Sequence, residues 1–104
     1  MENLSYTGKG VCVAVLDTGI YPHMDLSRRI VAFYDYINQR EFPYDDNGHG
    51  THVCGILAGS GEASGGKHRG VAPGCLLIGM KVLDRNGNGR KEDVLKSAGL
   101  GDSQ

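Results

Sequence analysis

The run VCVAVL at residues 11–16, followed at once by Asp17-Thr18-Gly19, is the strongest indication of the fold in this sequence. It is a continuous apolar stretch rich in valine and bounded by Gly10 and the Asp-Thr-Gly turn, which is typical of a strand buried on both faces. Such strands belong mostly to parallel sheets. Two further apolar runs, at residues 30–34 and 75–83, predict additional strands.

Helical spacing appears between these runs. Val53, Ile56 and Leu57 predict a helix over residues 49–58 that ends at Gly59, and a second helix is predicted from Lys91. Polar residues 38–47 and glycine-rich residues 60–70 predict loops, and residues 84–90 predict a turn. Strands that alternate with helices predict an α/β fold with a mainly parallel sheet.

Composition limits the partners and the location. The chain has 104 residues, enough for one domain, and its net charge of -1 gives no reason to expect nucleic acid or an anionic membrane as a partner. It has no apolar run of the roughly 18 residues that a membrane span needs. Cys12, Cys54 and Cys75 lie in apolar contexts and predict buried, reduced thiols, so we expect a cytoplasmic location, or secretion if a leader precedes Met1.

Two side chains stand out as candidates for catalysis. Asp17 directly follows a predicted strand, where functional groups gather in open α/β sheets, although a turn aspartate that bonds its own backbone fits equally well. His49 lies between Gly48 and Gly50 at the start of a predicted helix. A carboxylate held against one ring nitrogen of a histidine leaves the other nitrogen free to accept a proton from a hydroxyl nucleophile.

Three motifs in a fixed order carry a family resemblance. The segments VAVLDTGI at 13–20, NGHGTHVCG at 47–55 and GVAPG at 70–74 resemble those of the subtilisin-like serine proteases, the subtilases. The resemblance covers residues 8–98. It implies a three-layer subtilisin-like fold with a mainly parallel sheet, incomplete in this chain, and it identifies residues 1–104 as the N-terminal part of a peptidase catalytic domain.

The resemblance also implies roles for single residues. Asp17 would orient the histidine, His49 would be the general base, and His52 would be structural. Gly87, Asn88 and Gly89 would pair with an extended peptide or protein substrate, and glycines suit main-chain pairing because they permit close approach.

The serine half of the catalytic machinery is absent from these residues. The family's nucleophile lies in a Gly-Thr-Ser motif, and an asparagine supplies its oxyanion donor, but neither segment occurs in the sequence. The resemblance therefore implies a serine endopeptidase that hydrolyses peptide bonds through an Asp-His-Ser triad, whereas this chain alone is expected to be inactive.

No cofactor is expected. Some subtilases bind calcium through an aspartate at the position of Asp25, but residues 61–69, which would complete the site, are short and basic. Residues 84–89 match the first six positions of a calcium-binding loop, whereas Leu95 stands where that loop requires glutamate. A zinc site formed by His49, His52 and Cys54 would lack a fourth ligand of suitable spacing.

Two other functions remain open. The chain can be a non-catalytic fragment that binds peptides through residues 87–89. It can also be a small homodimeric aspartic protease, in which two copies of Asp17 share a proton, although that hypothesis leaves the histidine motif unexplained. Residues 97–104 break the helical pattern, so the chain looks cut off, and self-association through an exposed sheet edge is expected.

Overall fold

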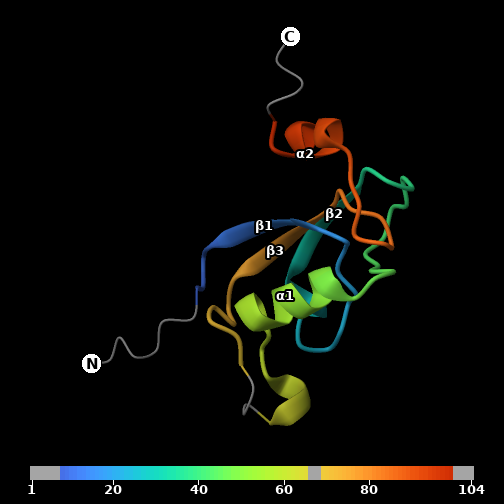
Figure 1. The fold of residues 1–104 in the computed structure, drawn as a ribbon. Helices are drawn as coiled ribbons and strands as arrows, with labels where there is room; N and C mark the ends of the chain where they lie inside the picture. Colours follow the sequence, from blue (N-terminus) through green and yellow to red (C-terminus); the bar gives the residue numbers. More distant parts are fainter. Residues whose placement is uncertain (1–7, 66–68, 100–104) are drawn as a thin grey trace.

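The computed structural model describes residues 8–65 and 69–99 and shows a small α/β fold (Figure 1). The predicted strands and helices are present, with ends within two residues of those expected. In chain order the elements are β1 Cys12–Asp17, β2 Ile30–Asp35, α1 His49–Ala58, β3 Leu76–Lys81 and α2 Lys91–Ser97, with short 3-10 helices at Ser27–Arg29 and Glu62–Ser64.

The three strands form one parallel sheet in the order β1-β3-β2, which confirms the predicted parallel arrangement. The last strand in the chain therefore lies in the centre of the sheet. Lys81, at the end of β3, is aligned with Asp17 on one side and with Asp35 on the other. All three strands thus end in a charged residue at the same edge of the sheet.

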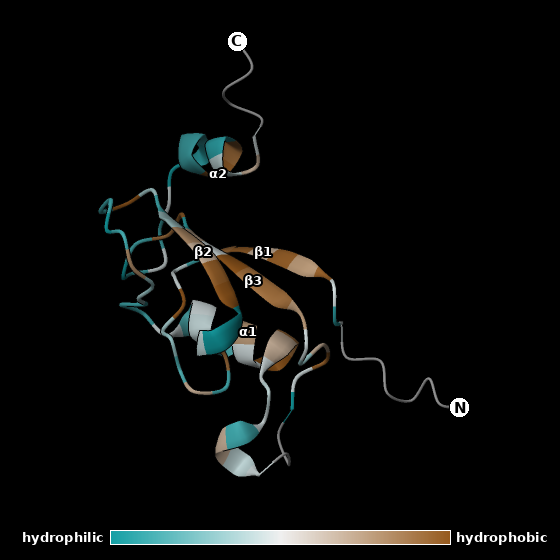
Figure 2. Cartoon of the chain, turned by 180° about the vertical axis from the view of Figure 1, so that it is seen from behind, coloured by the Kyte–Doolittle hydropathy of each residue, from teal (hydrophilic) through white to brown (hydrophobic). Residues whose placement is uncertain are grey.

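The core lies between the sheet and α1. Leu77 of β3 is fully buried, whereas the preceding Leu76 is 37% exposed on the other face, as the alternation of side chains along a strand requires. Figure 2 shows the strands as the most hydrophobic elements and α2 as largely hydrophilic. The buried core residues are Ile20, Leu26, Cys54, Ala58, Cys75 and Leu77.

The prediction that the first strand is buried on both faces is wrong. Cys12 and Ala14 of β1 are exposed, because β1 is an edge strand and α1 packs on only one face of the sheet. Cys12 is therefore an exposed thiol, whereas Cys54 and Cys75 are buried as expected. Residues 18–29, which connect β1 to β2, contain a 3-10 turn where a βαβ unit would have an α-helix.

The loop between β2 and α1 is organised by Asp35. This buried carboxylate accepts hydrogen bonds from the backbone N–H groups of Ile37, Asn38 and Arg40 and from the hydroxyl of Tyr44. Burial and the neighbouring Asp35 carboxylate raise the pKa of Tyr44 to about 12, so its hydroxyl stays a donor. The loop thus reaches α1 in a defined conformation.

Within the described ranges, no helix is long and apolar enough to cross a membrane.

Candidate active site

Asp17 is held rigidly at the end of β1. Its side chain is only 12% exposed, and its Oδ1 atom accepts a hydrogen bond of 2.7 Å from the backbone N–H of Thr18. The carbonyl oxygen of Asp17 accepts the N–H of Val82 at 3.0 Å, in the segment that follows β3. Both the carboxylate and the backbone of this residue are therefore fixed by neighbouring groups.

His49, the first residue of α1, faces this carboxylate. Its Nδ1 atom lies 2.9 Å from Oδ1 and 3.0 Å from Oδ2 of Asp17, whereas 64% of the side chain is exposed to solvent. The hydrogen bond to Asp17 and the negative charges of Asp17 and Asp45 raise the pKa of His49 above 6.5. With Nδ1–H donating to Asp17, Nε2 is left to accept a proton, and the resulting imidazolium is stabilised.

Asp45 connects the turn after β1 to the start of α1, a role that the sequence reasoning missed. Its carboxylate accepts hydrogen bonds from the N–H groups of Asn47, Gly48 and Thr51 and from the hydroxyls of Thr18 and Thr51. Burial alone would raise the pKa of Asp45, but the hydrogen bonds from Gly48, Thr51 and Asn47 outweigh burial and lower it to about 2. The sequence feature that could have indicated this role of Asp45 is an acidic residue shortly before the start of a helix.

Two glycines allow α1 to approach the turn after β1. A Cβ atom on Gly50 would lie 2.1 Å from the carbonyl oxygen of Gly19, and a Cβ on Gly19 would lie 2.1 Å from that of Tyr44. The N–H of Gly50 donates to the Thr18 hydroxyl at 2.9 Å. The absence of a side chain at Gly50, next to His49, therefore allows α1 to pack against the turn that follows Asp17.

The predicted substrate segment, residues 87–89, belongs to a closed turn. The backbone N–H of Asp84 donates to the carbonyl oxygen of Asn88 at 2.7 Å, and the N–H of Asn88 donates to the Asp84 carboxylate at 3.0 Å. The Asn47 side chain donates to the carbonyl oxygen of Arg85 at 2.9 Å, which tethers this turn to the loop before α1. The substrate-binding role of Gly87, Asn88 and Gly89 stays a prediction, because the structure brings together only the aspartate and the histidine.

The residues considered as metal ligands have other partners. Asp25 accepts the N–H of Ala63 at 2.8 Å, and Asp84 accepts the N–H groups of Asn86 and Asn88. Residues 66–68 of the loop discussed for calcium lie outside the described residues. Among residues 8–65 and 69–99, no group of three or more His, Cys, Asp or Glu side chains could hold a metal ion.

Cys54 lies apart from the two histidines of the zinc hypothesis. It is fully buried on the core-facing side of α1, and burial is the main reason that its pKa is raised to about 12. His49 and His52 are exposed instead. A thiol in this state is an inert core residue.

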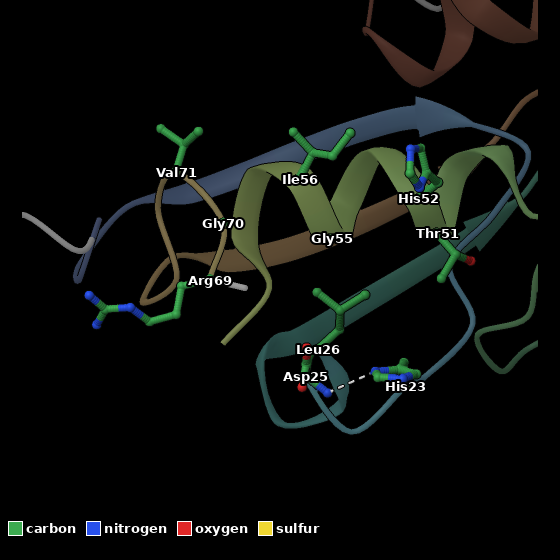
Figure 3. A pocket seen from close by; sticks show the side chains of 10 residues that line it. All are labelled: His23, Asp25, Leu26, Thr51, His52, Gly55, Ile56, Arg69, Gly70 and Val71. Carbon is green, nitrogen blue, oxygen red and sulfur yellow. Dashed lines mark hydrogen bonds between the residues drawn. The ribbon is translucent and has the colours of Figure 1, made fainter. Parts of the chain in front are cut away.

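A separate cleft of about 720 Å³ runs along α1 (Figure 3). Thr51, His52 and Ile56 line it from α1, facing the loop that carries His23 and Leu26. His52 therefore lies in a different surface feature from the Asp17 carboxylate, and its structural role stays a prediction.

Comparisons with known proteins agree on one family. A model of the subtilase family of peptidases matches residues 8–100. The serine protease AprX of Bacillus subtilis is 58% identical over 90 residues, which are 86% of this chain and 20% of AprX. The minor extracellular protease Epr of the same organism is 41% identical over 86% of this chain and 13% of Epr.

A solved structure agrees with the sequence relatives. The crystal structure of a cold-adapted subtilisin-like serine proteinase matches with a TM-score of 0.78 and 32% identity, over 92% of this chain and 33% of that protein. The chain thus spans a third or less of the length of each of these proteins.

Replacing Gly50 tests the close approach of α1. Gly50→Ala is expected to lower the free energy of unfolding by roughly 1 to 3 kcal/mol, because the added methyl group would overlap the Gly19 carbonyl oxygen. Gly55→Ala in the same helix is the matched control. It meets no atom within 4 Å and is expected to stabilise the protein by roughly 0.5 to 1 kcal/mol. Urea denaturation followed by circular dichroism measures both changes, and stabilisation by both would contradict the packing described.

The low pKa of Asp45 predicts a dependence of stability on pH. Because the folded-state value of about 2 lies below the ordinary 3.8, the ionised carboxylate stabilises the fold above pH 3.8, and this contribution disappears as the pH falls toward 2. We expect a loss of roughly 1 to 2 kcal/mol after allowing for solvent screening. Denaturation at several pH values should show a smaller acid dependence in Asp45→Asn, and identical profiles would refute the assignment.

Proposed function

Since the chain belongs to the subtilase family, we propose that it supplies the aspartate and the histidine of the Asp-His-Ser triad of a serine endopeptidase. The observation that carries this proposal is the hydrogen bond from His49 Nδ1 to the buried Asp17 carboxylate, at the carboxyl end of a parallel strand. This contact also favours the triad over the aspartic-protease hypothesis, in which Asp17 would face a second Asp17.

The chemistry follows from this geometry. Nε2 of His49 accepts the proton of a serine hydroxyl as its oxygen attacks the carbonyl carbon of a peptide bond. The imidazolium then donates that proton to the leaving amine as the C–N bond breaks, which gives an acyl-enzyme. Water next attacks the acyl carbonyl carbon while His49 accepts its proton, and return of that proton to the serine oxygen, as the ester bond breaks, releases the acid and the free serine. Asp17 keeps His49 in the Nδ1–H tautomer throughout and stabilises the imidazolium.

The serine of the triad has no counterpart within these residues. Ser27, Ser60, Ser64 and Ser97 lie in short turns, a loop and the end of α2, and Ser5 and Ser103 lie outside the described residues. None of the six is part of a Gly-Thr-Ser motif. We therefore propose that the 104 residues alone do not hydrolyse peptides and that a segment with the serine must complete the site.

The proposed substrate is a peptide or protein that pairs with residues 87–89 in an extended conformation. A non-catalytic, peptide-binding fragment is the second hypothesis, and it predicts saturable peptide binding that is lost in Gly87→Val.

The relative Epr is described as an extracellular protease, which supports the secreted alternative for this chain over the expected cytoplasmic location.

A chimaera tests the proposed catalytic roles. We replace the matching segment of AprX with this chain, which is 58% identical to it, and measure the hydrolysis of casein and of a chromogenic peptide. The chimaera is expected to be active, and the chain alone inactive. His49→Ala and Asp17→Asn should lower kcat of the chimaera by roughly 10⁴- to 10⁶-fold, the range known for triad members of subtilisin.

His23→Ala serves as the matched control for the chimaera. The ring of this exposed histidine accepts a hydrogen bond from the nearby Asp25 N–H, and its loss should leave kcat unchanged. An active chimaera that tolerates His49→Ala would refute the role of His49. Hydrolysis by the chain alone that disappears in His49→Ala would refute the need for a separate serine segment.

We also propose that the chain associates with itself through β1, one of the two edge strands of the described sheet, whose outer face is exposed. Sedimentation velocity should show dimers or larger species that become monomers in Ala14→Lys, because a charge on the exposed face opposes edge pairing. Ala98→Lys, an identical change at an exposed position after α2, should leave the distribution unchanged. A wild-type protein that stays monomeric at high concentration would contradict the proposal.

A further inference from the structure

Lys81 is a fully buried lysine at the end of the central strand. A charged ammonium group is strongly disfavoured in a protein interior unless it is paired and hydrogen-bonded. The Nζ atom donates to the carbonyl oxygens of Thr18 at 2.6 Å and Leu83 at 2.9 Å and to the carboxylate of Asp46 at 2.7 Å. Since an ammonium group has three hydrogens, the three acceptors use all of them.

The surroundings of this ammonium group are suited to a cation. The aromatic ring of Tyr44 lies 5.3 Å from Nζ, within the range of a cation–π interaction. Asp46 retains 34% side-chain exposure, so the pair lies at the boundary between the core and the surface. A hydrocarbon side chain of equal length would leave two carbonyl groups and one carboxylate without their donor.

The three acceptors belong to three segments that surround the candidate active site. Thr18 directly follows Asp17, Asp46 lies three residues before His49, and Leu83 leads into the turn with residues 87–89. These segments are far apart in the sequence. One ammonium group therefore connects the turn that carries the aspartate, the loop that leads to the histidine and the approach to the predicted substrate segment.

Thr18 takes part in this connection through its carbonyl oxygen, its hydroxyl and its N–H group. Its carbonyl oxygen accepts from Lys81, its hydroxyl donates to Asp45, and its N–H donates to the Asp17 carboxylate. The residue next to Asp17 is thus fixed through all of its polar groups. Lys81 supplies the one of these contacts that comes from the central strand.

We propose that Lys81 is a positioning residue, whose ammonium group holds the turn after Asp17 and the loop before His49 at the separation that lets the two side chains meet. The inference rests on the proposed function, because it treats these two residues as the catalytic pair. Lys81 itself is fully buried, and the hydrogen bonds of its Nζ atom go to Thr18, Asp46 and Leu83. It acts through Thr18 and Asp46.

A purely electrostatic role of Lys81 predicts the opposite change in the pKa of His49. Removing a nearby positive charge would raise the pKa of His49, because an imidazolium is repelled by cations. Loosening the pair would lower this pKa, because the Asp17 carboxylate is the main cause of its elevation and Asp45 the other negative group that contributes. The direction of the change therefore separates the two roles.

The experiment is an NMR titration of the histidine ring nitrogens in the 104-residue chain, with the His49 signal identified by its loss in His49→Gln. In Lys81→Met, we expect the pKa of His49 to fall toward 6.5 and the share of the Nδ1–H tautomer to decrease. Lys96→Met removes an exposed lysine of α2 and controls for net charge. Leu77→Ala removes core packing from the same strand and controls for a general loss of stability.

An unchanged or raised pKa of His49 in folded Lys81→Met would overturn the proposal, as would an equal fall in Leu77→Ala. If Lys81→Met fails to fold, Asp46→Asn removes the charged partner without emptying the core. Because this change also removes a negative charge, which by itself lowers the pKa of His49, the measurement in this variant is the share of the Nδ1–H tautomer. That share is expected to decrease, and an unchanged share would likewise overturn the proposal. Because the titration needs neither serine nor substrate, its result is independent of whether the chimaera hydrolyses peptides.

Discussion

The contact between the start of α1 and the turn after β1 is the constraint on which the site depends. Gly50 packs on Gly19 without any side chain between them, and the Gly50 N–H donates to Thr18. This contact brings a helix start within hydrogen-bonding reach of a strand end. The distance between the backbones of His49 and Asp17 is therefore set by this packing. The hydrogen bond between their side chains forms across that distance.

The polar groups around this contact form a single network. Asp45 connects the helix start to Thr18, and Lys81 connects Thr18 to the loop before the helix. When every member of such a network has its hydrogen-bond partners, the network can stabilise a fold by more than the sum of its separate pairs. Among the described residues, no buried side-chain nitrogen or oxygen lacks a hydrogen-bond partner, so the network meets this condition.

The sequence predicted the elements better than their surroundings. The strands, α1 and its end at Gly59 followed from apolar runs, helical spacing and a glycine stop, which are local properties. The exposure of Ala14 in β1 could not be predicted, because it depends on which elements cover each face of the sheet. Asp17 and His49 were found through motifs, whereas Lys81 was missed because two of its three acceptors lie 63 and 35 residues away in Thr18 and Asp46.

The contacts that position the aspartate and the histidine come from three short windows, residues 17–20, 44–51 and 81–83. The loops at 36–43 and 59–74 lie outside these windows. We expect insertions and deletions at exposed positions of those loops to change the outline of the protein with less effect on the distance between the two side chains than changes within the windows. A site built in this way can acquire new surface shapes around unchanged chemistry, because variation and geometry are assigned to different parts of the chain.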